Sequence, residues 1–224
     1  MYRAKQEGGA DGDHIAFYSQ DMNQGMQERM RIETGLRAAL GNGELLLHYQ
    51  PKFCIENGKI IGAEALVRWR HPQRGLVPPA EFVPELERTG LVIAVGRQVM
   101  QRAMQDWRAW HDAGLQPPQI AVNVAPAQFR CDSLFTDIEH ALNTAGADKH
   151  PLSIEITESS LVSDHDRVVD ILSRIRALEV PVAIDDFGTG YSSLSYLVSL
   201  PVDVMKIDRS FVTRMSQDAG YMGL

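Results

Sequence analysis

Two adjacent acidic residues, Asp185 and Asp186, follow an apolar run and precede a loop that is spaced by Gly188 and Gly190. The apolar run, 181–184, is typical of a buried parallel strand. Because neighbouring side chains on a strand point to opposite faces, both acids can bind one metal only where the strand is ending. Two such acids repel each other unless a cation lies between them. An isolated Asp-Asp pair is more often an Asx turn that caps a helix, so the meaning of this pair depends on the rest of the chain.

Three more polar residues lie in or near the ends of apolar stretches, and two of them precede Asp185 at a regular interval. Glu64 lies inside one apolar stretch, and Asn123 and Glu155 lie near the ends of two others. Asn123 and Glu155 are 32 positions apart, and Glu155 and Asp185 are 30 positions apart. Each interval is about one βα unit, so we expect these side chains at equivalent ends of successive strands.

Some of these charged residues also have a simpler interpretation as half of an ion pair. Glu64 and Arg68 share a face of their strand, and a pair between them would offset the cost of an acid in an apolar strand. Lys206 could pair in the same way with Asp203 or Asp208. The sequence leaves these alternatives open.

Hydrophobic periodicity and turn residues predict the elements that position these side chains. A helix is expected from about residue 21 to 40, and two strands, 45–53 and 60–69, are joined by a short turn and are therefore antiparallel. Further helices are expected at 79–89, 96–113, 134–145 and 164–178. Further strands are expected at 15–18, 119–124, 152–158, 181–184 and 202–208, while residues 91–95 fit either a strand or the approach to a helix.

The alternation of strands and helices after residue 119 favours a barrel or a doubly wound parallel sheet. In a (β/α)₈ barrel, chemistry lies at the carboxyl ends of the strands. Six polar side chains would then meet in one cavity: Glu64, Asn123, Glu155, Asp185, Asp186 and Lys206. Such oxygen ligands suit Mg²⁺ or Mn²⁺, which can hold a phosphodiester and activate water, and Lys206 could orient that water.

The composition is that of one main globular domain with a short extra segment. The chain has 224 residues, of which 44% are hydrophobic and 23% are charged. Its formal net charge of -7 argues against a surface that tracks nucleic acid. Cys54 and Cys131 lack metal-type spacing, and apolar runs such as Leu91 to Val95 are shorter than the roughly 18 residues of a membrane span. A cytoplasmic location is therefore expected, without membrane contact by this chain, although a longer parent protein could be anchored in a membrane.

Several stretches of the sequence together resemble the EAL domain family. The three most specific are Glu64-Ala65-Leu66-Val67-Arg68-Trp69, Glu155-Ile156-Thr157-Glu158-Ser159 and Asp185-Asp186-Phe187-Gly188-Thr189-Gly190-Tyr191-Ser192-Ser193-Leu194. Three shorter ones match in order: Tyr49-Gln50-Pro51-Lys52, Val122-Asn123-Val124 and Met205-Lys206-Ile207-Asp208. The resemblance implies an α/β fold, a modified TIM barrel, that hydrolyses the second messenger cyclic di-GMP to linear pGpG with two Mg²⁺ or Mn²⁺ ions.

The resemblance also implies a role for each site residue. One metal would be held by Glu64, Asn123, Glu155 and Asp185, and the second by Asp185 and Asp186. Lys206 would contact the nucleophilic water. The residues expected to take part in catalysis are Glu64, Asp186 and Lys206. Glu158 would anchor the loop from Asp186 to Leu194. The nucleotide would be met by Gln50, Leu66, Arg68 and Asp208, with Arg68 at a phosphate.

The resemblance further divides the chain into three parts. Residues 1–20 resemble the tail of a GGDEF domain, 21–43 form a linker helix and the first helix of the EAL domain, and 44–224 form an EAL barrel. We count six barrel strands where the fold needs eight, so the barrel is expected to be truncated at its C-terminal end and its second metal site incomplete. Unpaired strand edges near residues 45 and 202 would then favour a homodimer or a higher assembly.

Two other functions stay open from the sequence. An inactive module could bind cyclic di-GMP or a protein partner without turnover, and an unrelated metal-dependent barrel could share the motifs by chance.

Overall fold

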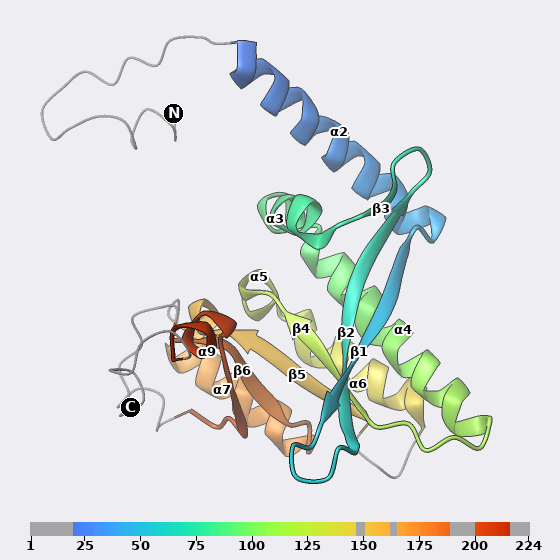
Figure 1. Cartoon of the computed structure of the whole chain (residues 1–224), viewed down its shortest axis with the longest axis vertical. Coiled ribbons are helices and arrows are strands. Elements are labelled where there is room, and N and C mark those ends of the chain that lie inside the picture. The colour runs from blue at the N-terminus through green and yellow to red at the C-terminus, as the bar shows by residue number, and fades with distance from the viewer. Residues whose placement is uncertain (1–19, 147–150, 162–164, 189–199, 216–224) are drawn as a thin grey trace, which may run out of the picture.

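A twisted, mainly parallel sheet forms the centre of the computed structural model, which describes residues 20–146, 151–161, 165–188 and 200–215 (Figure 1). Its strands are β1 (Leu45–Phe53), β2 (Ile60–His71), β3 (Gly75–Val77), β4 (Gln119–Val124), β5 (Leu152–Thr157), β6 (Val182–Phe187) and β7 (Val204–Ile207). The helices are α2 (Gln20–Asn42), α3 (Pro79–Thr89), α4 (Val92–Asp112), α5 (Pro126–Phe129), α6 (Ser133–Ala145), α7 (His165–Ala177) and α9 (Arg209–Met215). A 3₁₀ helix, η1 (Glu158–Leu161), follows β5.

The order of strands in the sheet is β1-β2-β4-β5-β6-β7, with β3 paired to β2. β1 and β2 are antiparallel, as the short turn between them predicts, and Gln50 lies opposite Glu64. From β2 to β7, successive neighbours along this order are parallel. In the described part of the chain the sheet does not close, and β1 and β7 are its outer strands.

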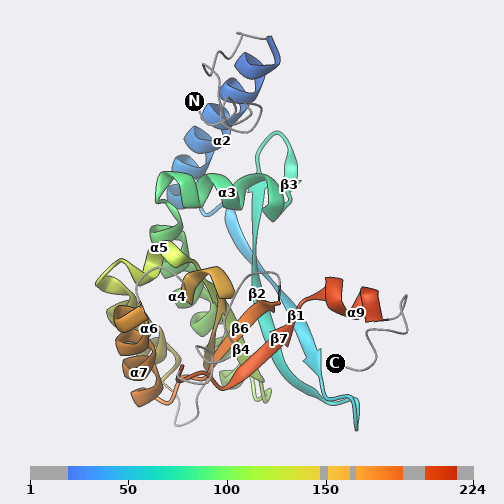
Figure 2. The same cartoon turned by 90° about the vertical axis from the view of Figure 1, so that its left-hand side faces the viewer.

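Side chains along each parallel strand point alternately to the two faces of the sheet, so one face packs in the apolar core and the other carries the polar residues. Val122, Ile154 and Ile184 are fully buried and belong to one large apolar cluster with residues of α4, α6 and α7. These three helices lie on one side of the sheet (Figure 2). The residues next to these in sequence, among them Asn123 and Glu155, point to the opposite face because the side-chain period of a strand is two.

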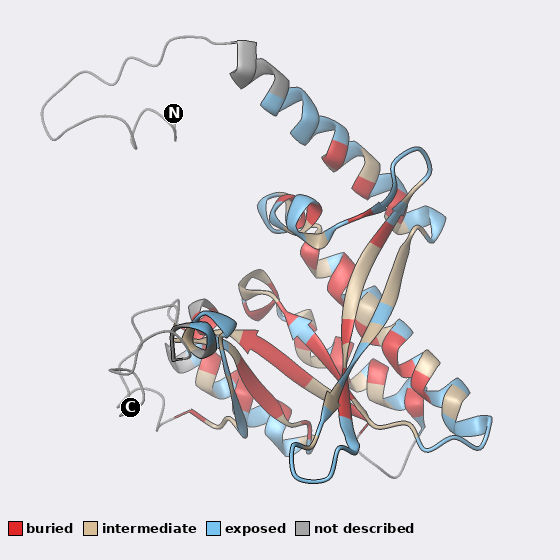
Figure 3. Ribbon diagram, in the orientation of Figure 1, coloured by how far each residue is buried: buried red, intermediate tan, exposed pale blue. Residues whose placement is uncertain are grey.

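A second apolar cluster joins the carboxyl half of α2 to α3 and β2. Leu36, Trp69, Phe82 and Leu86 are buried in it, whereas the earlier part of α2 extends away from the body of the domain (Figures 1 and 3). Core packing thus accounts for only half of this helix, and Met26 in the other half is 64% exposed.

Several details of the fold differ from the sequence prediction, which also did not include η1 and α9. Helix α4 begins at Val92 rather than at Gly96, so residues 91–95 lead into and form a helix. β3 was not foreseen; it pairs with β2 through residues 75–77. Helix α5 was also not foreseen, and it is four residues long.

The predicted strand 15–18 and the GGDEF-like segment lie outside the described residues. None of the described helices combines the length and hydropathy needed to cross a bilayer.

Tyr49 attaches β1 to helix α4, and this contact predicts a loss of stability at alkaline pH. Its hydroxyl donates a hydrogen bond to Asp106 Oδ2 at 2.7 Å, and its ring packs edge-on against Trp110. Burial, followed by the bond to Asp106, raises the pKa of Tyr49 above its ordinary value. The unfolded chain therefore ionises Tyr49 near its ordinary pKa of about 10 while the folded chain does not, so stability falls as pH rises above about 10.

We expect Tyr49→Phe to lower the free energy of unfolding by about 1 kcal/mol at neutral pH. The variant should also lose less stability than the wild type between about pH 8 and about pH 11, because no phenol remains to ionise. Urea denaturation at the two pH values measures both effects. An equal alkaline loss in the two proteins would show that Tyr49 is not the group responsible.

Candidate metal centre

Three carboxylates from three strands meet on the face of the sheet opposite the helices. Glu64 comes from β2, Glu155 from β5 and Asp185 from β6, and one oxygen of each lies within 4.8 Å of the others. The side chain of Glu155 is 0% exposed, while those of Glu64 and Asp185 are 17% and 22% exposed. Burying three acids together is costly unless cations neutralise them, so this cluster needs a positive partner.

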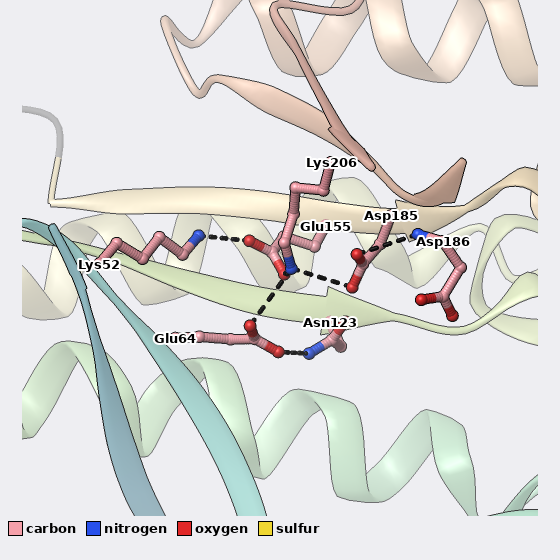
Figure 4. A network of polar contacts seen from close by, with 7 residues as sticks. All are labelled: Lys52, Glu64, Asn123, Glu155, Asp185, Asp186 and Lys206. Atoms are coloured by element: carbon pink, nitrogen blue, oxygen red, sulfur yellow. Dashed lines mark hydrogen bonds and ion pairs between the residues drawn. The ribbon is translucent and has the colours of Figure 1, made fainter. Parts of the chain in front are cut away.

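Lys206 of β7 supplies that positive charge (Figure 4). Its Nζ donates to Glu64 Oε2 at 3.2 Å and to Asp185 Oδ2 at 2.9 Å, and it also contacts Glu155 Oε2. Burial alone would lower the pKa of Lys206, but hydrogen bonds to Glu155 and Asp185 outweigh it and raise the pKa above its ordinary value. The ammonium therefore lies among the same three carboxylates that could hold a metal ion.

The simpler ion pairs that the sequence left open for Lys206 are wrong. The carboxylate of Asp203 accepts a hydrogen bond from Val182 N at 2.9 Å. That of Asp208 accepts one from Ser210 N at 2.8 Å, in the first turn of α9. Both acids accept backbone N–H groups, and Lys206 bonds instead to acids on three other strands.

The alternative pair between Glu64 and Arg68 is also wrong. Glu64 Oε1 accepts a hydrogen bond from Asn123 Nδ2 at 2.8 Å. Arg68 instead donates to the carbonyl of its neighbour Val67 at 2.9 Å. Asn123 therefore belongs to the group around the three carboxylates, and its amide oxygen remains for a further ligand.

Asp186 lies beside the carboxylate cluster rather than within it (Figure 4). Its φ of 53° is unusual for a residue with a side chain, and its N–H donates to Asp185 Oδ1 at 2.9 Å. The pairing of β6 with β7 is irregular between Ile184 and Phe187. Burial, then repulsion from Asp185 and Asp208, raises the pKa of Asp186. The two acids thus lie at an irregular strand end, where a cation would relieve their repulsion.

We expect Asp186→Asn to stabilise the metal-free chain slightly, by about 0.5 kcal/mol after solvent screening. The asparagine removes the repulsion and tolerates a positive φ. Urea denaturation with a chelator measures the effect, and Asp170→Asn, at an exposed position on α7, is the control. A clear loss of stability in Asp186→Asn would contradict this interpretation.

Glu158 lies beside the start of the loop that it is predicted to anchor. It is 4% exposed, and its Oε2 accepts a hydrogen bond from the backbone N–H of Gly188 at 3.1 Å. Gly188 has a φ of 96°, and a Cβ there would lie 2.5 Å from the ring of Phe211. Residues 189–194 of this loop lie outside the described part of the chain, so the anchoring role of Glu158 stays a prediction.

An apolar pocket of about 280 Å³ opens beside the carboxylates, between β2, α3, α4 and α5. Leu66, Arg68 and Asn123 line it, together with apolar side chains of the helices such as Val83 and Val95. Gln50 is exposed on β1 opposite Glu64. Of the four residues expected to meet a nucleotide, Leu66 and Arg68 thus share one pocket, while Asp208 caps the start of α9.

Sequence reasoning gave no role to Lys52, which the structure places in contact with Glu155 Oε1. The register of β1 against β2 was the sequence signal that could have placed Lys52 in the site. Pairing of β1 with β2 sets Lys52 opposite Gly62 and Gln50 opposite Glu64, so Lys52 lies on the same face as Glu64.

The fold and the site define a class of protein: a TIM-barrel-like α/β domain whose acidic side chains gather on one face of its parallel strands. The chain belongs to the EAL domain family, whose model matches residues 33–222. Members of this family depend on metal, and the carboxylate cluster is a site that could hold one.

Named relatives include two signalling proteins. The chain is 41% identical to the bifunctional diguanylate cyclase/cyclic di-GMP phosphodiesterase MucR of Pseudomonas aeruginosa, over 98% of this chain and 32% of MucR. It is 37% identical to the cyclic di-GMP phosphodiesterase PdeR of Escherichia coli, over 95% of this chain and 31% of PdeR. The chain therefore spans about a third of the length of these relatives.

Solved EAL structures share the fold. The PaMucR phosphodiesterase in complex with c-di-GMP superposes with a TM-score of 0.80 at 41% identity, covering 86% of this chain and 78% of that one. The EAL enzyme Bd1971 in its cGMP-bound form gives 0.80 at 30% identity, over 90% of this chain and 56% of that one. The sequence-based prediction of a TIM-barrel-like fold of EAL type is confirmed.

Proposed function

We propose that this chain hydrolyses cyclic di-GMP to linear pGpG with the help of Mg²⁺ or Mn²⁺. The observation that carries the proposal is the meeting of Glu64, Glu155 and Asp185 from three strands around one point. Support comes from the 41% identity to a relative named as a cyclic di-GMP phosphodiesterase. Carboxylate and amide oxygens are the ligands that these hard cations prefer.

The residues that would hold the cations are those of the cluster and its neighbours. Glu64, Asn123, Glu155 and Asp185 would hold one, and Asp185 with Asp186 would contribute to a second. A divalent cation bound there supplies Lewis-acid chemistry, because it activates water and offsets the charge that develops on the phosphate. The three acids suit this task since they are already close together and need a positive partner.

The remaining residues would bind and orient. Lys206, once released from the carboxylates, would hold the attacking water at its ammonium. Leu66 and Arg68 line the apolar pocket, which would take a guanine base, and Arg68 would donate to a phosphate. Gln50 and Asp208 would contact the nucleotide at the edges of the site. Glu158 would hold the loop that begins at Gly188.

The proposal extends to the context of the domain. Residues 44–224 would form the EAL barrel, and 21–43 the helix that joins it to a GGDEF-like segment at residues 1–20. We place the chain in the cytoplasm as a homodimer or higher assembly. The outer strand β7 supports association, because Val204, Met205 and Ile207 are each more than half exposed.

Chromatography of cyclic di-GMP incubated with the purified chain tests the proposal. We expect pGpG to form with Mn²⁺ and not with excess chelator. If calorimetry shows binding in the roughly micromolar range while no pGpG forms over hours, the chain is a binding module instead of an enzyme. Neither binding nor product would remove cyclic di-GMP as the ligand.

A further inference from the structure

Lys52 reaches the carboxylate cluster at Glu155, where its ammonium and that of Lys206 contact different oxygens of the carboxylate (Figure 4). It lies on β1, and its stem passes over Gly62, where a Cβ would lie 3.5 Å from Lys52 Cδ. Its Nζ contacts Glu155 Oε1, and its side chain is 35% exposed. The side chain of Glu155 is fully buried, so the partly exposed Lys52 of β1 forms an ion pair with the least accessible acid of the cluster.

The two lysines differ in what else they touch. Lys206 contacts all three carboxylates and lies among the oxygens that could hold a cation. Lys52 has its ion pair with Glu155 alone in the part of the chain that the structure describes. A cation that enters the cluster must therefore displace Lys206, but it can leave Lys52 in place because the two ammonium groups hold different oxygens of Glu155.

A charge count shows what Lys52 would do after that exchange. The three carboxylates carry three negative charges, and a divalent cation with the Lys52 ammonium carries three positive charges. With a single cation bound, Lys52 would therefore complete the neutralisation of a buried group that this cation alone would leave negative. The same positive charge repels the cation, so it must also weaken cation binding.

We propose that Lys52 is a positioning residue of the metal centre, which holds Glu155 through Oε1 and which would limit the affinity of the cluster for a cation. This inference rests on the proposed function. It assigns to β1 a part in the site beyond the nucleotide contact expected of Gln50. Removing a group that orients a metal ligand usually weakens metal binding. Lys52 differs because its positive charge also repels the cation, and we expect the repulsion to be the larger effect.

Calorimetric titration of the full chain with Mn²⁺, in the absence of nucleotide, tests this assignment. We expect Lys52→Met to bind Mn²⁺ about tenfold more tightly than the wild type, the size of the repulsion removed. Lys52→Arg keeps the charge and should stay within about twofold of the wild type. Lys59→Met, at an exposed position of the same hairpin, is the matched control and should not change the affinity.

Turnover gives a second readout that separates positioning from general damage. Lys52→Met should lower kcat for cyclic di-GMP while KM stays near the wild-type value, because Glu155 loses its fixed orientation. Structural damage would weaken Mn²⁺ binding and lower the melting temperature together. If Lys52→Met does not fold without metal, Lys52→Gln, which can still donate to Glu155, carries the same expected tightening.

The proposed role of Lys52 is wrong if Lys52→Met and Lys52→Gln bind Mn²⁺ no more tightly than Lys59→Met does. Failure of the proposed function is distinguishable from this outcome. A wild type that makes no pGpG would end the phosphodiesterase proposal, whereas the Mn²⁺ titration contains no nucleotide and still decides the role of Lys52.

Discussion

Replacing Lys206 with methionine should destabilise the metal-free chain by about 3 kcal/mol and abolish hydrolysis of cyclic di-GMP. Lys206 is bonded to Glu64, Glu155 and Asp185 at once. Without Lys206, the three carboxylates repel one another and little positive charge offsets their negative charge. One of the three, Glu155, is fully buried. Removing one partner of a buried ion pair is costly because the other charge stays behind.

Urea denaturation in the presence of a chelator measures the stability loss, and Lys59→Met is the control. We expect added Mn²⁺ to recover more stability in Lys206→Met than in the wild type, because the cation no longer competes with the ammonium. The expected loss of turnover follows from the missing contact to the attacking water. A metal-free variant as stable as the wild type would contradict the assigned role of Lys206.

Replacing Glu64 with glutamine should lower the rate of pGpG formation by at least about a hundredfold. The amide keeps the size of the side chain but removes a negative charge from the cluster. It also cannot accept hydrogen bonds through both terminal atoms, so it cannot satisfy Asn123 and Lys206 together as Glu64 does. Both changes weaken the hold on a cation.

Calorimetry and a product assay together measure this effect. Nucleotide binding should be affected less than turnover, because Leu66 and Arg68 of the pocket are unchanged. Glu56→Gln, at an exposed position of the β1–β2 turn, is the matched control and should behave as the wild type. Equal rates of product formation in Glu64→Gln and the control would show that Glu64 is not needed for hydrolysis.

Strand register explains which parts of the fold and site could be predicted from the sequence. The short turn at Asn57-Gly58 led to the antiparallel β1–β2 pair. The regular interval between Asn123, Glu155 and Asp185 led to a common face, because each βα unit returns the chain to the same edge of the sheet.

The missed features depend on contacts between residues far apart in sequence. Strand β3 is three residues long, too short for a periodic pattern, and its partner is β2. The beginning of α4 was placed four residues late because Val92 and Val95 are apolar and β-branched, which suits a strand as well as a helix. The role of Lys52 needed the register of β1 against β2, and the conformation of Asp186 needed the irregular pairing of β6 with β7.

A crystal structure of the chain grown with Mn²⁺ tests the central claim most directly. We expect an anomalous peak bordered by Glu64, Asn123, Glu155 and Asp185, with Lys206 Nζ moved out from between the carboxylates. An ion bound elsewhere, with Lys206 still bonded to all three acids, would contradict the account.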